Sequence, residues 1–384
     1  SSQNGNLARR NFRTGTGTSL RRQMPRGQRF RFNWNTPFIL SHHKSTTYYC
    51  AGNYVLRSLE RGDKLEVISP KITQTDRGSA TALAESPLNK SVLYVGTDDG
   101  NLWVTKDGGK KWTNITKNVK LPGPRWVNSI EASRAKEGRV YVVFDGHRSN
   151  DDNPHVYVSE DFGKTWKSLK SNLPWGTTRV LREDLTNQDL LYLGTEFGFW
   201  FSADRGKSWK QLHNNLPTVA IHEIAQHSTN GELVVATHGR SLWALNVTTL
   251  RSMSTSDLKK VQLYPPASVV RWQRKPTPGG TLRRFTGQNP FNGATIYYSL
   301  PAKAKQVRLT IENSDGALVR LRVSADRGLH RVNWGLTRNV RGRPGAARSR
   351  TVAPGTYQVV LSVDGKEHAQ TLTILPDPKL RKEK

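Results

Sequence analysis

An eight-residue phrase, Ser/Thr-x-Asp-x-Gly-x-x-Trp, occurs three times in the sequence and limits the folds that are open to it. The copies end at Trp112, Trp166 and Trp209, and each follows a short run rich in Val, Leu, Tyr or Phe. Self-similarity at intervals of about 20 to 50 residues is typical of solenoids, propellers and arrays. The phrase therefore predicts a repeated structural unit instead of one undivided core.

Two further copies of this unit are degenerate. Residues 58–65 have Glu60 where the phrase has Asp and Leu65 where it has Trp, and residues 233–245 lack the phrase altogether. Successive units end 47, 54 and 43 residues apart, and the longer interval contains the polar insertion 147–154. Short apolar runs separated by Gly, Asp and Asn turns at this spacing predict all-β blades of about four strands, as in a β-propeller.

The phrase has a structural explanation. Its Asp can accept backbone N–H bonds across a turn, its Gly can adopt a positive φ, and its Trp can pack between neighbouring sheets. We therefore predict structural roles for the nine residues Asp107, Gly109, Trp112, Asp161, Gly163, Trp166, Asp204, Gly206 and Trp209.

This phrase is similar to the Asp-box, or BNR repeat, of sialidases and sortilin-type propellers. Residues 31–41 (RFNWNTPFILS) and 236–243 (ATHGRSLW) resemble recurring phrases of the sortilin-like proteins described as glycosyl hydrolase, BNR repeat. The resemblance covers nearly the whole chain and identifies it as the C-terminal portion of such a protein. It implies an exported protein, periplasmic or extracellular. The basic ends of the chain, described below, further predict peripheral association with a membrane complex.

The C-terminal third also reads as strands joined by SDG, PG and DG turns. Residues 293–301 and 355–378 are similar to an Ig-like domain of the flagellar-hook-assembly type. The predicted fold is thus all-β, with a partial or five-bladed Asp-box β-propeller followed by an Ig-like β-sandwich. The expected boundaries are propeller 1–250, linker 251–264, sandwich 265–378 and basic tail 379–384.

The start of the chain departs from the pattern of the family. Residues 4–7 align with residues 99–102, so the first blade is expected to lack its first strands. An open propeller exposes unpaired strand edges, which folded proteins avoid. We expect either closure among the blades present or docking against another chain, such as the upstream blades of its own precursor.

The excess of basic residues lies at the two ends of the chain. Of the net charge of +29, residues 1–59 hold ten Lys and Arg with no acid, and residues 251–384 hold 25 basic and 8 acidic residues. Residues 60–250 are nearly balanced, with 24 basic and 22 acidic residues. This separation predicts that the ends contact a polyanionic neighbour.

The alternative is a solvated basic surface on a protein of high pI. Partners that fit the charge are an acidic protein, a multi-subunit membrane complex or an anionic membrane surface. Nucleic acid is not expected, because no DNA- or RNA-binding motif is present. The predicted docking residues are Arg9, Arg10, Arg13, Arg21, Arg22, Arg26, Arg29, Arg31, Arg271, Arg274, Lys275, Arg283, Arg284, Arg341, Arg343, Arg348 and Arg350.

The family label raises the question of glycoside hydrolysis, which needs a pair of carboxyl groups. The carboxyl groups outside the boxes stand at strand ends or turns, and none lies in a recognisable catalytic phrase; the candidates are Asp145, Glu183, Asp184, Glu196 and Glu223. We therefore expect a non-catalytic protein-binding or scaffold module. A glycan-binding or sialidase-like propeller is the alternative.

Two smaller features complete the search for sites. His238 and Arg240 follow a strand and would contact a ligand if that strand faces the propeller channel, or else serve a turn. No metal site or cofactor is predicted, because His222-Glu223 is followed by a His at the wrong spacing for a zinc helix. The only cysteine, Cys50, stands within a predicted strand and is expected to be a buried thiol.

Overall fold

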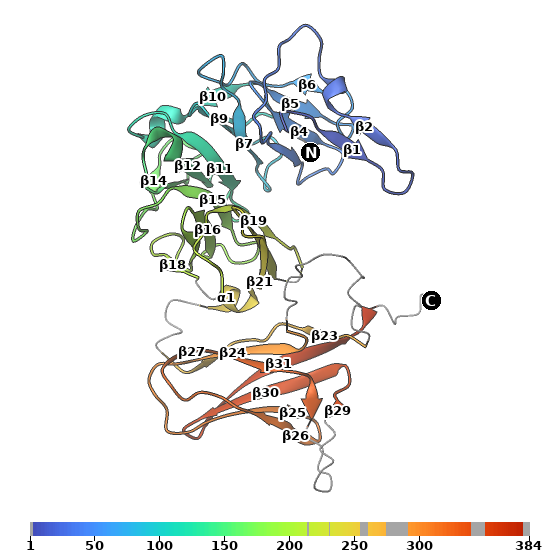
Figure 1. Ribbon diagram of the computed structural model, residues 1–384, viewed down its shortest axis with the longest axis vertical. Helices are drawn as coiled ribbons and strands as arrows, with labels where there is room; N and C mark the ends of the chain where they lie inside the picture. Colours follow the sequence, from blue (N-terminus) through green and yellow to red (C-terminus); the bar gives the residue numbers. More distant parts are fainter. Residues whose placement is uncertain are drawn as a thin grey trace. The chain divides into compact units, whose positions relative to one another are not determined.

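The structure is a computed structural model, and it describes residues 3–212, 215–229, 231–253, 260–273, 291–338 and 350–378. The chain divides into two compact units, Ser1–Leu245 and Asn246–Lys384. Strands dominate the described residues of both units, which confirms the all-β prediction (Figure 1). Within those residues no helix is long and apolar enough to cross a membrane.

The first unit is a series of antiparallel sheets that follow one another along the sequence (Figure 1). Four of them have four strands each: β3 (Phe38–Leu40), β4 (Tyr48–Ala51), β5 (Val55–Ser58) and β6 (Glu66–Val67); β7 (Ala80–Glu85), β8 (Leu93–Thr97), β9 (Leu102–Thr105) and β10 (Trp112–Asn114); β11 (Trp126–Ala132), β12 (Val140–Asp145), β13 (His155–Ser159) and β14 (Lys167–Ser168); β15 (Thr178–Glu183), β16 (Leu191–Thr195), β17 (Gly198–Ser202) and β18 (Lys210–Gln211). The sheets have the order of propeller blades, each strand pairing with the next in sequence.

The two ends of this unit hold smaller sheets. A hairpin of β1 (Ala8–Arg10) and β2 (Gly17–Ser19) precedes the four sheets, and β19 (Ile221–Gln226), β20 (Glu232–Thr237) and β21 (Leu242–Asn246) follow them. Three 3-10 helices lie in the connections, namely η1 (Arg21–Gln23), η2 (Thr116–Val119) and η3 (His147–Ser149). The first strands of successive sheets contact each other, β7 with β11, β11 with β15, and β15 with β19.

Strand β12 shows why the sheets stack. All six of its residues are buried, and alternate side chains point to opposite faces of the sheet. Val142 and Phe144 pack with residues of the β7–β10 sheet, whereas Tyr141 and Val143 pack with residues of the β15–β18 sheet. The continuous apolar run of this strand therefore forms part of two hydrophobic cores at once.

The three intact boxes share one hydrogen-bond pattern. The first residue of each, Thr105, Ser159 or Ser202, accepts the N–H of the Gly four residues later at 2.8 to 3.0 Å. The same hydroxyl donates to the box Asp at 2.7 or 2.8 Å. That Asp accepts the N–H four residues further on at 2.9 Å in all three boxes. The box Gly residues have φ of 99°, 85° and 81°, a region that favours glycine.

The box Trp joins each sheet to the one before it. Trp112 Nε1 donates to the carbonyl of Ile68 at 2.6 Å, and Trp209 Nε1 donates to the carbonyl of Leu169 at 2.8 Å. Trp166 packs against the core shared by the β7–β10 and β11–β14 sheets. In the degenerate box, Leu65 replaces the Trp and is buried in a cluster with Leu7 and Cys50.

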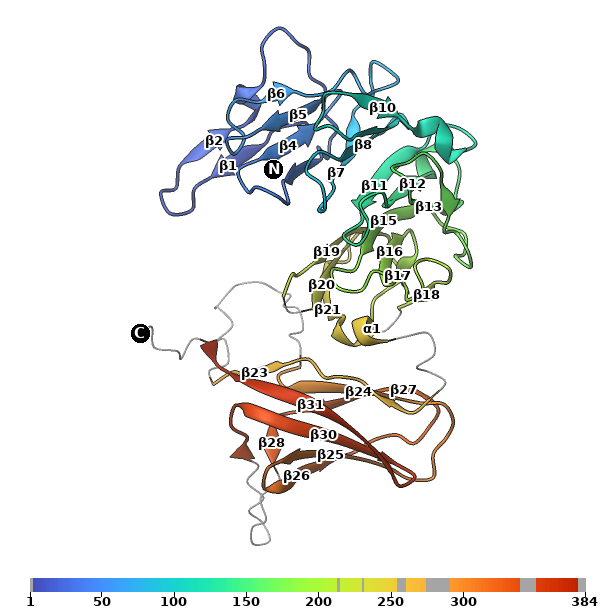
Figure 2. The same ribbon diagram turned by 180° about the vertical axis from the view of Figure 1, so that it is seen from behind.

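The second unit is a two-sheet β-sandwich, seen from its other side in Figure 2. Its core includes Ile296 and Trp334 from one sheet and Leu309 and Leu361 from the other. One sheet has the order β22 (Gln262–Leu263), β24 (Ala294–Leu300) and β27 (Gly328–Trp334); the other has the order β23 (Val269–Arg271), β31 (Lys366–Pro376), β30 (Gly355–Val363), β25 (Val307–Asn313) and β26 (Gly316–Leu321). The remaining described elements are the pair β28 (Thr337–Arg338) and β29 (Arg350–Thr351) and the helix α1 (Thr248–Ser252).

The predicted domain boundaries can be set beside these elements. Strand β22 lies inside the range 251–264 that the sequence predicts as a linker, and it pairs with β24 of the sandwich. Assignment of the sandwich to the Ig-like type stays a prediction.

Candidate functional site

The N-terminal basic segment, residues 3–31, contains the β1–β2 hairpin and leads to β3. Three of its cations bind within the fold. Arg9 pairs with Asp63 at 3.0 Å, Arg21 donates to the carbonyl of Asn4, and Arg31 donates to the carbonyl of Arg77. Arg9 and Arg31 thus bind the segment to later parts of the propeller unit, and Arg21 joins two parts of the segment itself.

Four other arginines of the segment, Arg10, Arg13, Arg26 and Arg29, are exposed. None of them forms an ion pair with an acidic residue of the described chain. Among the described residues of the segment, only Arg9 forms an ion pair. Their charges are therefore free to meet an external anion.

The other predicted docking residues are described only in part. Arg271 ends β23 and is half-buried. The side chains of Arg22 and Arg350 lie outside the described part of the structure, and so do the residues Arg274, Lys275, Arg283, Arg284, Arg341, Arg343 and Arg348.

His238 and Arg240 lie in the exposed turn after β20. Gly239 has φ of 75°, Arg240 N donates to Thr237 Oγ1 at 3.1 Å, and Trp243 Nε1 donates to the Arg240 carbonyl at 2.8 Å. These hydrogen bonds are the ones expected if His238 and Arg240 serve a turn. His238 also stacks edge-on against His222 of β19, with ring centroids 4.9 Å apart.

A charged cluster stands beside these histidines. Arg179 on β15 pairs with Asp145 and with Glu196, at 2.5 Å in each case. Burial acts to raise the pKa of Glu196, but the hydrogen bond and charge of Arg179 outweigh it and lower that pKa. The pKa of His222 is lowered by burial and by Arg179. The Glu196 carboxylate is thus held ionised, which suits hydrogen-bond acceptance better than proton donation.

A second charged cluster lies on the first strands of three successive sheets, β11, β15 and β19. Arg182 on β15 contacts Glu131 on β11 at 3.6 Å and Glu223 on β19 at 2.6 Å. Burial raises the pKa of Glu131 to about 7, although Arg182 and Arg134 act in the opposite direction. Glu131 is therefore a carboxyl group that can exchange a proton near neutral pH. Neither Arg179, Arg182 nor Glu131 was a candidate on sequence grounds.

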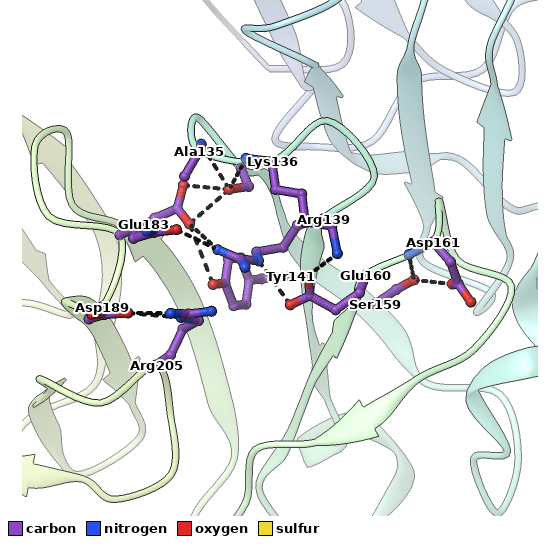
Figure 3. A network of polar contacts seen from close by, with 12 residues as sticks. Ala135, Lys136, Arg139, Tyr141, Ser159, Glu160, Asp161, Glu183, Asp189 and Arg205 are labelled. Carbon is purple, nitrogen blue, oxygen red and sulfur yellow. Dashed lines mark hydrogen bonds and ion pairs between the residues drawn. The ribbon is translucent and has the colours of Figure 1, made fainter.

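Glu183 and Asp184 have structural surroundings instead. Glu183 is 1% exposed and accepts hydrogen bonds from Ser133 Oγ at 2.8 Å and from the backbone N–H of Arg134 at 2.7 Å (Figure 3). Asp184 accepts a hydrogen bond from Thr186 N at 2.9 Å. The Glu183 carboxylate joins its strand to a turn of the neighbouring sheet, whereas the Asp184 carboxylate caps the turn between β15 and β16 of its own sheet.

No metal-binding group stands out. The described residues contain no cluster of three or more His, Cys, Asp and Glu side chains that could hold a metal ion. Cys50 is fully buried, and its burial raises the pKa of the thiol to about 12. A thiol in this state is a poor nucleophile and a poor metal ligand.

Comparison with known proteins supports a β-propeller. The model of the Sortilin-Vps10 family (sortilin, neurotensin receptor 3) matches residues 53–196, which hold the two complete sheets β7–β10 and β11–β14. A search of curated proteins gives no significant match.

Several solved structures resemble the chain at low identity. An ancestral GH74 enzyme is 13% identical with a TM-score of 0.44, covering 88% of this chain and 46% of its own. The GH74 xyloglucanase from Xanthomonas campestris is 17% identical with a TM-score of 0.49, covering 94% of this chain and 55% of its own. YCF48 bound to D1 peptide is 14% identical with a TM-score of 0.39, covering 85% of this chain and 90% of its own. The chain thus spans about half the length of these GH74 enzymes.

These neighbours correct one expectation from the sequence. The prediction that the chain is not an enzyme is contradicted, because GH74 glycoside hydrolases stand among the structures that resemble it. The absence of a catalytic phrase does not exclude an enzyme, because a pair of carboxyl groups brought together from separate strands leaves no such phrase. The low TM-scores give no assignment of their activity to this chain.

Proposed function

We propose that this chain is an exported protein-binding module that docks on an acidic partner through its N-terminal basic segment. The observation that carries the proposal is the set of exposed arginines, Arg10, Arg13, Arg26 and Arg29, that no described acidic residue neutralises. Arg forks pair with carboxylates in two-pronged geometry, which gives orientation as well as affinity. An acidic subunit of a membrane complex would present such carboxylates.

The proposal predicts salt-sensitive binding of acidic peptides. We expect a labelled peptide of about 20 residues rich in Glu and Asp to bind, while a Gln/Asn peptide of equal length does not. Raising ionic strength from about 0.05 M to 0.5 M should weaken binding at least about tenfold, because exposed charges are screened. Fluorescence anisotropy measures both effects. Equal affinities for the two peptides, or an affinity that does not change with ionic strength, would contradict the proposal.

A second function has its own supporting observation, the pair Glu131 and Glu223 around Arg182. Glycoside hydrolysis uses a carboxyl group that donates a proton, and the raised pKa of Glu131 supplies such a group beside Glu223, which pairs with the same Arg182. In this second proposal Glu131 is the proton donor and a neutral polysaccharide is the substrate.

Hydrolysis should then depend on the protonated form of Glu131. We expect activity on a panel of neutral polysaccharides, xyloglucan included, to fall as pH rises through about 7, because the acid form is lost above its pKa. Glu131→Gln should remove the activity, whereas Glu66→Gln, a change at an exposed carboxylate of β6, should leave it intact. Reducing-sugar release is the measurement, and full activity in Glu131→Gln would exclude this role.

A further inference from the structure

The degenerate box adjoins a cavity of about 750 Å³. The lining comes from the β1–β2 hairpin, the turn between β3 and β4, and the turn between β5 and β6, and it includes Arg10, Lys44, Thr46, Glu60, Arg61 and Asp63. The degenerate box at residues 58–65 thus lies on the wall of this cavity.

The departures in this box change what its turn does. Ser58 still accepts the N–H of Gly62 at 3.0 Å, and Gly62 still has a positive φ of 98°. The acidic residues, however, pair with cations: Glu60 pairs with Lys64 of the same box at 3.1 Å, and Asp63 pairs with Arg9 of the hairpin at 3.0 Å. In the intact boxes the Asp is bound inside its own turn. Here the turn holds the hairpin in place and leaves a cavity between them.

Three cations of the lining, Arg10, Lys44 and Arg61, are exposed and form no ion pair with a described acidic residue. Arg61 stands in the left-handed region with φ of 59°, the conformation that the same turn position has in the intact boxes. Thr46 adds a buried hydroxyl oxygen that has no hydrogen-bond partner in the described structure. The cavity therefore offers unpaired positive charge together with unused hydrogen-bonding groups.

The surroundings favour a polypeptide over a phosphate polymer. Phe12, at the tip of the same hairpin, is 93% exposed, and an exposed aromatic side chain beside a charged cavity is typical of protein interfaces. We propose that this cavity is the docking site for an acidic segment of a partner polypeptide, with its carboxylates on Arg10, Lys44 and Arg61.

This inference rests on the proposed function, and two matched triple variants separate them. The cavity variant carries Arg10→Gln, Lys44→Gln and Arg61→Asn, the last because Asn tolerates a left-handed backbone. The control variant carries Arg13→Gln, Arg26→Gln and Arg29→Gln, three exposed arginines of the same segment that are outside the lining. Each variant loses three positive charges. Circular dichroism and thermal unfolding establish that both remain folded.

The measurement is the affinity of the Glu/Asp-rich peptide for the full chain and for both variants. We expect the cavity variant to lose about tenfold or more in affinity and the control variant less than about threefold. Equal losses in both variants would overturn the cavity site while leaving docking through the basic segment intact. No binding to the unaltered chain would overturn both. Tighter binding of inorganic polyphosphate or anionic vesicles than of the peptide, lost in the cavity variant, would overturn the polypeptide as occupant.

Discussion

Replacing Trp209 by Ala is expected to lower the free energy of unfolding of the propeller unit by about 3–5 kcal/mol. Trp209 is 2% exposed and packs in the core between the β11–β14 and β15–β18 sheets. The variant also leaves the carbonyl of Leu169 without the indole N–H that it accepts at 2.8 Å. The substitution removes both a large apolar side chain and a hydrogen bond between two sheets. Urea unfolding followed by fluorescence measures the change.

Trp175 provides the matched control for this experiment. Its side chain is 72% exposed, so Trp175→Ala should change the free energy of unfolding by less than about 0.5 kcal/mol. A loss in Trp209→Ala no larger than the loss in Trp175→Ala would show that the box Trp does not join the sheets.

Replacing Glu183 by Ala should cost about 3 kcal/mol of folding free energy. The carboxylate accepts hydrogen bonds from Ser133 Oγ and from the backbone N–H of Arg134, and it lies 3.7 Å from the buried guanidinium of Arg139 (Figure 3). The variant leaves these buried donors of the neighbouring sheet with fewer acceptors. Denaturant unfolding at neutral pH measures the loss.

The control for Glu183 is the exposed ion pair of Glu66 with Arg57, at 2.6 Å. Glu66 is about half exposed, and surface ion pairs of this kind contribute about 0–1 kcal/mol. Glu66→Ala should therefore be close to neutral. If Glu183→Ala were equally mild, the carboxylate would not hold the two sheets together.

The repeated phrase predicts the main features of the first unit because its interactions are local. In each box, Ser or Thr, Asp and Gly bond within five residues of one another, as at Ser202 and Asp204. The Trp comes at a fixed distance from that turn, so its place between sheets follows from the same pattern. Local interactions of this kind leave a sequence signature that can be recognised from one copy to the next.

The charged clusters on the first strands leave no such signature. Arg182 contacts Glu131 and Glu223, which lie 51 and 41 positions away in the sequence. One residue of each strand faces this cluster, and only the stacking of three sheets brings them together. A search for catalytic phrases therefore overlooks Glu131. The sheet that contains Glu131 is nevertheless predictable, because its strands are short apolar runs separated by turns.

The contacts of the basic segment with the degenerate box are likewise not predictable from the sequence. The sequence predicts an acid-free run of arginines, but it treats all of them alike. The structure separates Arg9, which is bound to Asp63, from Arg10, which borders the cavity without an acidic partner. That difference depends on a contact between residues 54 positions apart, which the local pattern does not contain.

Hydrogen exchange of the full chain, with and without the saturating Glu/Asp-rich peptide, tests docking through the basic segment most directly. The account predicts slower exchange in residues 3–31 and in the turns at residues 44–46 and 59–63. It predicts no change around Glu131, Arg182 and Glu223. Protection confined to β11, β15 and β19, with the N-terminal segment unchanged, would contradict the account and place the ligand on the first strands of the propeller.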